Sequence, residues 1–188
     1  TVEGYYVLLN RSFDIDARVS GRDIALDQPQ LDRLLDGEST ILLQARRDEL
    51  GLEVEDFRVN ASRLTATAQG LINSTSSNLR AQVSMPSLAD AGPELGGSLE
   101  ATAEVTGPQN QRRLTLNGQA QDLRIGIEAL DNALSGQTEL TASALQTAQG
   151  FQLEDFRLAN PQLSADAQGS FAQGALDAVA HVAVVDLS

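Results

Sequence analysis

Apolar and polar residues alternate along most of this chain. Leu64, Ala66 and Ala68 alternate with two threonines and a glutamine, and the run from Leu79 to Met85 repeats the pattern. Successive side chains of a β-strand point to opposite faces, so a period of two predicts strands with one apolar and one polar face. The further strands predicted in this way are 99–105, 114–116, 123–127, 163–167 and 178–184.

Turn residues separate these strands. Turn-forming clusters lie at 60–62, 73–78, 107–110 and 160–161, so strand and turn recur every ten to twelve residues. One interruption has helical spacing, because Leu31, Leu34 and Leu35 follow the i, i+3, i+4 rule; Asp27 is a candidate N-cap and Gly37 follows the end. A second helical turn is predicted at 87–95. The pattern as a whole predicts an antiparallel, meandering all-β sheet with one or two short helices per repeat.

The chain contains an internal repeat. Residues 51–70 read GLEVEDFRVNASRLTATAQG and residues 150–169 read GFQLEDFRLANPQLSADAQG, with ten identities in twenty positions and no gap. The offset of 99 holds on both sides, over about 75 residues. A register kept this long indicates a repeated structural unit rather than a shared short motif. We therefore divide one continuous elongated domain into copy 1, residues 1–112, and copy 2, residues 113–188.

Alanine is frequent at the apolar positions of the predicted strands. A sheet with one apolar face buries that face against another layer, and the core of a two-sheet sandwich is normally filled by large side chains. Two interpretations follow: a closely packed layer in which alanines face leucines, or a folded-over sheet whose lumen holds an apolar guest. The alanines in question are residues 66, 68, 81, 101, 103, 165, 167, 178 and 180.

Charge and composition exclude several classes of protein. With 26 acidic and 13 basic residues the net charge is −13, which repels nucleic acid and makes it an unlikely partner. The chain has no cysteine, so thiolate catalysis, cysteine zinc sites and disulfides are excluded. No run reaches the roughly 18 apolar residues of a membrane helix, and Thr1 to Asn10 lacks the basic start of a signal peptide.

Candidate catalytic groups are few. His181 is the only histidine, and its place in an alternating run predicts a solvent-facing strand residue. The adjacent acids Glu55 and Asp56 recur as Glu154 and Asp155, which suits a structural corner better than an active site. Arg58 and Arg157 are expected to pair with these acids on the exterior, a contact worth little when exposed. We expect no enzymatic activity, no metal and no cofactor.

A family resemblance rests on the same segments. Each copy has a short leucine-containing helix closing on glycine and an alternating strand, and Gly51 is followed by LEVEDFRV and then RLTATAQG. Residues 84–107, SMPSLADAGPELGGSLEATAEVTG, add a short link that ends in Gly-Gly before the next strand. This pattern resembles the TamB family of the AsmA-like superfamily. The resemblance implies a periplasmic segment of an inner-membrane-anchored protein with a taco-like folded sheet and an apolar lumen.

The resemblance also implies two functions. One is a hydrophobic conduit that carries phospholipid between the inner and outer membranes; the alternative is a scaffold for assembly of outer-membrane β-barrel proteins with an outer-membrane TamA-like partner, which would dock outside this segment. A β-solenoid enzyme or adhesin is a third class, for which the chain shows neither clustered acids nor long loops. The residues expected to line the lumen and contact acyl chains are Val54, Phe57, Val59, Leu64, Ala66, Ala68, Leu79, Ala81, Val83, Phe156, Leu158, Leu163, Ala165, Ala167, Ala180 and Val182.

Overall fold

Twelve antiparallel strands form one sheet in the computed structural model, which describes residues 2–7, 12–25 and 27–185. The strands are β1 (Val2–Val7), β2 (Ser12–Arg22), β3 (Glu38–Arg47), β4 (Gly51–Ala61), β5 (Thr65–Asn73), β6 (Ser77–Met85), β7 (Gly96–Thr106), β8 (Arg113–Arg124), β9 (Gln137–Gln146), β10 (Gly150–Ala159), β11 (Leu163–Ala172) and β12 (Ala175–Val184). The short helices are α1 (Pro29–Leu34), the 3₁₀ turn η1 (Leu88–Asp90) and α2 (Glu128–Ala133).

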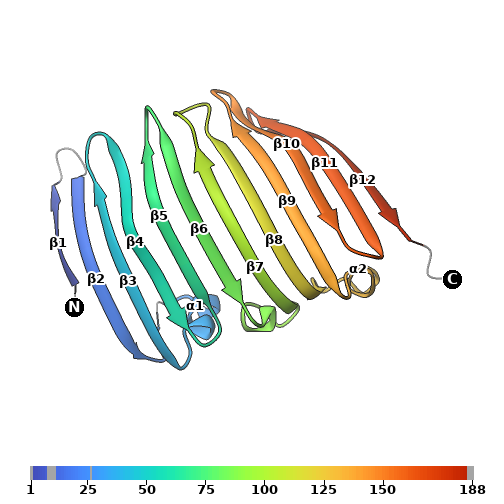
Figure 1. The fold of residues 1–188 in the computed structure, drawn as a ribbon, viewed down its shortest axis with the longest axis horizontal. Helices are drawn as coiled ribbons and strands as arrows, with labels where there is room; N and C mark the ends of the chain where they lie inside the picture. The colour runs from blue at the N-terminus through green and yellow to red at the C-terminus, as the bar shows by residue number, and fades with distance from the viewer. Residues whose placement is uncertain (1, 8–11, 26, 186–188) are drawn as a thin grey trace.

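The sheet is a pure meander. Each strand pairs with the strand before it and the strand after it in sequence, and β1 and β12 form the two edges of an open sheet (Figure 1). The strands are long and bent, and all helical segments lie at one end of them (Figure 1). The prediction of an all-β, antiparallel, meandering and curled sheet with short helices is confirmed.

The internal repeat is visible in the bounds of the elements. Helix α1 begins at Pro29 and α2 at Glu128, an offset of 128 − 29 = 99. Strand β3 spans 38–47 and β9 spans 137–146, which is the same offset at both ends. Strands β2, β4, β5 and β6 correspond in the same way to β8, β10, β11 and β12.

Two local predictions were wrong. Asp27 does not cap α1: Gln28 occupies the N-cap position, and Asp27 has a positive φ of 58° in the loop before it. The strand predicted at 123–127 ends at Arg124, because Gly126 turns the chain with φ 82° and Ile127 then becomes the N-cap of α2. Leu123, Ile125 and Ile127 have the period-two spacing of a strand, although the chain turns between them. The helical turn predicted at 87–95 is present as η1.

An aspartate fixes the start of each long helical connection. Asp23 has a φ of 55°, its amide donates to the Gly37 carbonyl, and its carboxylate accepts from the Gly37 amide at 2.8 Å. Asp122 repeats all three features with Gly136, again at 2.8 Å. Asp and Asn tolerate the left-handed conformation better than other non-glycine residues. The two bonds close each 15-residue connection at its base.

A β-bulge interrupts β4 and β10 at matching positions. Val54 pairs with Gly70 and Phe57 with Ala68, so Glu55 and Asp56 together face one residue of β5. In β10 the pairs are Leu153 with Gly169 and Phe156 with Ala167, which leaves the second Glu-Asp pair in the same position. An extra residue bends the strand and increases its twist. The prediction of a structural corner for these acids is confirmed.

Two clusters of buried apolar residues lie at the helix end of the sheet. One cluster joins Leu34 of α1 to Met85 and Leu88, and a second joins Ala133 and Leu134 of α2 to Leu163. Leu123 contacts both clusters and links the two copies. The helices therefore cover one end of the apolar face.

Candidate functional site: the apolar face of the sheet

Cross-strand register assembles one continuous apolar face. Phe57 of β4 pairs with Ala68, Ala68 with Ala81, and Ala81 with Ala103, and the series continues from β8 to β12. Directly paired residues lie on the same face. All sixteen residues expected to line a lumen fall on this face, which we call the apolar face.

The helices divide these sixteen residues into two groups. Leu64 and Val83 pack against the cluster of Leu34, Met85 and Leu88, and Leu158 and Leu163 belong to the cluster around α2. These four side chains serve as core of the helix end. The other twelve belong to neither cluster. Of these, Val59, Ala66, Ala165 and Val182 lie level with Val83 and Leu158, and the other eight lie nearer the turn end.

Large apolar side chains of this face remain exposed. Phe151 is 47% exposed and Phe171 is 49% exposed, and Leu114 is 41% exposed at the same end. On β12, Leu176, Val182 and Val184 are more exposed still. A contiguous exposed apolar surface of this kind marks a site of interaction with a partner or an apolar ligand.

The middle of the apolar face is built largely from alanine. At one level of the face, alanines stand on six of the nine strands from β4 to β12, and Phe57, Leu116 and Phe156 stand on the other three. The alanines are Ala68, Ala81, Ala103, Ala142, Ala167 and Ala180. Alanine buries little volume, so this level is lower on the alanine strands than at the two phenylalanines and the leucine.

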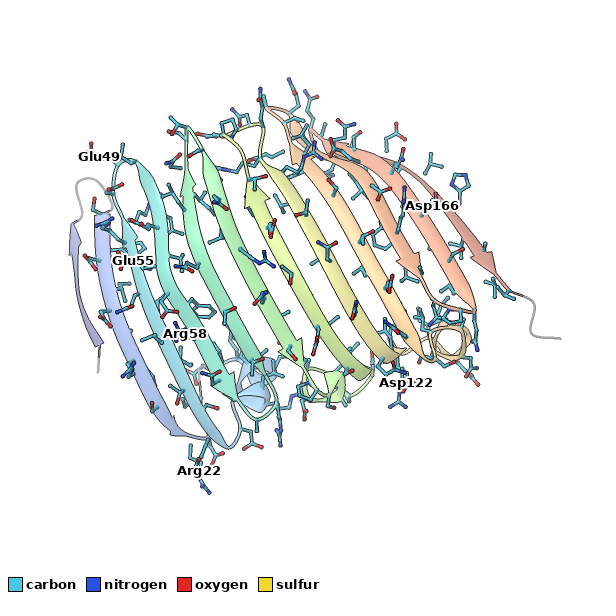
Figure 2. The ribbon with its side chains drawn as sticks, viewed as in Figure 1. Arg22, Glu49, Glu55, Arg58, Asp122 and Asp166 are labelled. Atoms are coloured by element: carbon cyan, nitrogen blue, oxygen red, sulfur yellow. The ribbon has the colours of Figure 1, made fainter. Side chains whose placement is uncertain are left out.

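The opposite face is polar, and ion pairs join side chains of its strands. Arg46 bonds to Glu53 between β3 and β4 at 2.5 Å, Arg80 to Glu104 between β6 and β7 at 2.9 Å, and Arg113 of β8 to Glu154 of β10. Figure 2 shows the charged side chains that surround these strands. Hydrogen bonds from Arg113 and Ser143 hold the pKa of Glu154 below its ordinary value, with Arg113 the larger cause.

A shallow hollow of about 630 Å³ lies on the polar face across β5 to β9. Its side chains are neutral polar groups with two acids, and they come from alternating positions of the strands. They are Thr65, Thr67, Gln82, Ser84, Glu100, Thr102, Asn117, Gln119, Glu139 and Thr141.

The candidate catalytic groups lie on the polar face, where Asp56 and Arg58 line one shallow hollow and Asp155 and Arg157 line another. His181 stands on the polar face, 3.2 Å from Asp166 of β11, and its side chain is 74% exposed, as expected for a solvent-facing strand residue. Arg58 pairs with Asp56 at 2.9 Å and Arg157 with Asp155 at 3.2 Å, which confirms the predicted exterior pairs. Within the described residues, no group of three potential metal ligands comes together.

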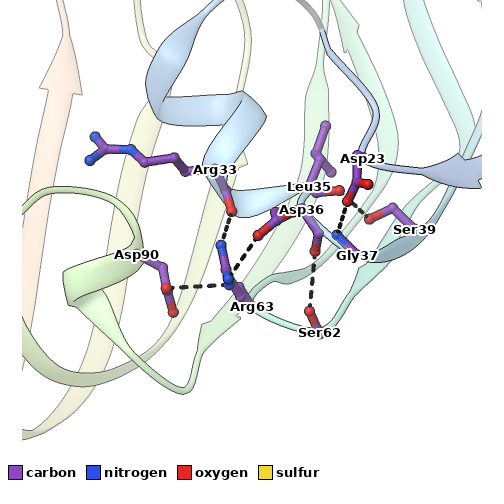
Figure 3. A network of polar contacts seen from close by, with 9 residues as sticks. All are labelled: Asp23, Arg33, Leu35, Asp36, Gly37, Ser39, Ser62, Arg63 and Asp90. Carbon is purple, nitrogen blue, oxygen red and sulfur yellow. Dashed lines mark hydrogen bonds and ion pairs between the residues drawn. The ribbon is translucent and has the colours of Figure 1, made fainter.

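A polar network locks α1 to the sheet in copy 1 (Figure 3). Arg63, in the turn between β4 and β5, donates to the Arg33 carbonyl at 2.9 Å and pairs with Asp36 at 2.9 Å and Asp90 at 3.4 Å. One side chain thus joins α1, η1 and the sheet. The network fixes the cover of the apolar face at the helix end.

The profile of the family described as TamB, N-terminal domain, matches residues 13–170. The match spans most of the chain and covers both copies of the repeat. The chain belongs to the TamB family. No curated protein and no solved structure matches it.

TamB membership indicates a periplasmic segment. Among the residues that the structure describes, no helix has the length and apolar character needed to cross a membrane. The single curled sheet with an apolar face is the architecture that the family resemblance implied, so the assignment and the fold agree.

Sequence reasoning missed part of the apolar face. Ile41 and Leu43 on β3, Leu116 on β8 and Leu140 on β9 lie on it and were not named as lining residues. The signal was present, since 137–146 alternates apolar and polar residues from Thr138 onward. These residues were missed because the lining was read from the most similar repeat segments, whereas strand pairing extends the face over every strand.

Proposed function

We propose that this segment carries phospholipid acyl chains on its apolar face, as part of a periplasmic conduit between the inner and outer membranes. The observation that supports the proposal is the apolar face itself, continuous from β2 to β12 and covered at one end by the described helices. A polar outer face keeps such a sheet in water, while the uncovered apolar residues favour an apolar occupant.

The energetics suit transport by sliding. Burial is worth roughly 0.8 kcal/mol per methylene, so an acyl chain of about 14 methylenes gains on the order of 10 kcal/mol before entropy losses. Every strand from β4 to β12 offers an alanine, a leucine or a phenylalanine at the level of Ala81, so the contacts of an acyl chain stay apolar from strand to strand. A lipid therefore moves across the strands while its headgroup stays in water.

Native mass spectrometry after incubation with phospholipid tests this function. The wild-type chain is expected to retain lipid that denaturation releases. Ala81→Asp places a charge in the uncovered part of the apolar face and is expected to abolish lipid retention. Gln82→Asp places the same charge one residue away on the polar face, and this variant is expected to retain lipid as the wild-type chain does. Circular dichroism confirms that both variants fold.

Two results contradict the proposal. One is a folded wild-type chain that retains no phospholipid under conditions in which lipid is in excess. The other is equal retention by the folded Ala81→Asp and Gln82→Asp variants. If an unfolded outer-membrane β-barrel protein binds the apolar face and phospholipid does not, the face is a protein-assembly scaffold that works with a TamA-like partner.

A further inference from the structure

A guanidinium group stands at the turn end of the apolar face in each copy of the repeat. In copy 1, Phe13 of β2 pairs with Arg47 of β3. The equivalent positions in copy 2 are 13 + 99 = 112 and 47 + 99 = 146, which are Arg112 and Gln146. The arginine is on the second strand of this pair in copy 1 and immediately before the first strand in copy 2. Each copy therefore has one positive charge at this cross-strand pair.

Both arginines lie on the apolar side of the sheet. Arg47 pairs on its other side with Leu52, and the series continues to Ile72 and Ser77. Gln146, the partner of Arg112, pairs with Phe151, and Phe151 pairs with Phe171. Each guanidinium therefore borders exposed or half-buried apolar side chains, which is the boundary that a lipid glycerol and phosphate require.

Among the residues that the structure describes, the groups that hold Arg112 in place are uncharged. It donates to the Ser77 hydroxyl at 2.9 Å, to the Asn73 carbonyl at 2.9 Å and to the Gln146 side chain at 3.4 Å. These three bonds leave two of the five guanidinium N–H groups for another acceptor. A half-buried cation oriented by neutral partners is prepared for an anion.

Arg47 is more exposed, and no described residue forms an ion pair with its side chain. The nearby carboxylate of Asp48 instead accepts from the amides of Leu50 and Gly51 within its own turn. Arg47 thus remains open to an anion at the end of the strand.

The two ends of the sheet differ in charge. The connections at the helix end, 23–37, 62–64, 86–95, 125–136 and 160–162, contain eight acids and two bases, Arg33 and Arg63. The described turns of the opposite end, 47–50, 74–76, 107–112, 147–149 and 173–174, contain two acids and two bases, and the bases are Arg47 and Arg112. In a chain of net charge −13, an anionic group is favoured at the turn end.

From these observations we infer that Arg47 and Arg112 bind the phosphate of a phospholipid whose acyl chains lie on the apolar face. The cross-strand pairs that carry the two guanidinium groups are equivalent and six strands apart, and the arginines themselves, on β3 and immediately before β8, are five strands apart. This inference rests on the proposed function, because it assigns the headgroup of the same lipid. It orients that lipid with its phosphate at the turn end and its chains directed toward the helix end.

Competition between two lipids with the same acyl chains tests the inference. The chain is incubated with vesicles that contain equal amounts of dioleoyl phosphatidylglycerol and dioleoylglycerol, which lacks phosphate, and is then re-isolated and the bound lipids are quantified. The wild-type chain is expected to prefer phosphatidylglycerol by about tenfold, the effect of one charge-assisted hydrogen bond. Because both lipids have the same acyl chains, a variant that changes only the affinity for acyl chains leaves the ratio of the two bound lipids unchanged.

Arg47→Gln is expected to lower the ratio of bound phosphatidylglycerol to bound dioleoylglycerol. The double variant Arg47→Gln and Arg112→Gln is expected to lower this ratio further, toward one. Arg113→Gln is the matched control, since Arg113 is adjacent but pairs with Glu154 on the polar face, and its preference stays at the wild-type value. The double change Phe13→Arg and Arg47→Gln copies the arrangement of Arg112 and Gln146, and is expected to restore the preference. If Arg112→Gln fails to fold, Arg47→Gln and its rescue still decide the matter.

The outcomes separate the inference from the proposed function. If the wild-type chain binds both lipids equally and Arg47→Gln has no effect, the phosphate stations are wrong and the acyl-chain site stands. If the folded chain binds neither lipid, both proposals fail. If inorganic phosphate binds the lipid-free chain through Arg47 while the two lipids bind equally, the arginines form a site for free phosphate and the lipid assignment is overturned.

Discussion

The two copies of the repeat keep one backbone with two different sets of side chains. Both copies close their helical connection through an aspartate and a glycine and both carry the same bulge. In copy 1, α1 is then locked by the ion pairs of Arg63. At the equivalent region of copy 2, Asn160 donates its side-chain amide to the Ser135 and Gln137 carbonyls and to Thr138.

This difference separates what the fold requires from what it tolerates. The elements that set backbone geometry recur as the same residue types, namely the positive-φ aspartate, the glycine that ends the connection and the bulged Glu-Asp pair. The interactions that hold the helical connection against the sheet differ between the copies: ion pairs of Arg63 in copy 1, and hydrogen bonds of Asn160 in copy 2. The predictions below use the second copy as the control for the first, from the largest expected effect to the smallest.

The largest effect is expected at a glycine between strands. A Cβ at Gly70 would stand 2.0 Å from the Asn78 carbonyl oxygen, at a φ of 135°, whereas a Cβ at the equivalent Gly169 would stand 2.6 Å from the Asp177 oxygen. Gly70→Ala should cost about 4 kcal/mol or more of unfolding free energy. Gly169→Ala should cost less, because its neighbour β12 is an edge strand and can shift. Urea unfolding of both variants measures this, and equal costs would contradict it.

The next effect concerns the leucine cores. Leu35 and Leu134 are equivalent, 4% and 3% exposed, so Leu→Ala at either position should cost about 3 kcal/mol through cavity formation. The preceding position differs, since Leu34 is replaced by Ala133 in copy 2. Ala133→Leu is therefore expected to destabilise by about 1 to 3 kcal/mol through overpacking. A stabilising Ala133→Leu, seen by thermal unfolding, would show that copy 2 has an unfilled cavity.

The two kinds of helix fastening should respond differently to salt. Asn160→Ala removes an amide group whose two N–H groups lie within hydrogen-bond distance of three acceptors and whose oxygen accepts from the Gln162 amide, and it should cost about 2 kcal/mol at any ionic strength. Arg63→Gln copies the residue at 162 and should cost about 1 kcal/mol, less at 1 M salt because its ion pairs are screened. Unfolding in low and high salt measures both, and a salt-independent Arg63→Gln effect would contradict the ion-pair account.

Acid sensitivity gives the smallest difference. The pKa of Glu154 is lowered in the folded chain, chiefly by Arg113, so its contribution is present above its ordinary pKa and is lost as pH falls through the lowered value. The equivalent residues of copy 1 are Glu55 and Asp14, which have like charges. Glu154→Gln should therefore weaken the dependence of unfolding free energy on pH in the acid range, and Glu55→Gln should not. Equal pH dependence of the two variants would contradict the assignment.

The sequence predicted the sheet because its signal is local. The alternation from Leu79 to Met85 identifies a strand from neighbouring residues alone. The offset of 99 shows which strand of copy 2 is equivalent to each strand of copy 1. Because every strand pairs with its sequence neighbour, local alternation also determined which residues share a face. Hence all sixteen residues expected to line a lumen lie on one side.

What the sequence did not predict depends on contacts between distant residues. That Leu64 and Val83 are covered by helices follows from the docking of α1 and η1, which no periodicity encodes. The left-handed conformation of Asp27 was missed because aspartate before a helix is also a common N-cap. The guanidinium of Arg112 becomes a feature of the apolar face only when the register places it beside Gln146.

The account stands on the claim that lipid occupies the uncovered apolar face. Its most direct test places a photo-crosslinking amino acid at Ala103, in the middle of that face, or at the adjacent Thr102 on the polar face, within the full parent protein in living cells. After irradiation, mass spectrometry of the purified protein identifies adducts. The account predicts phospholipid adducts at position 103 and few or none at 102; adducts at neither position, or equally at both, would contradict it.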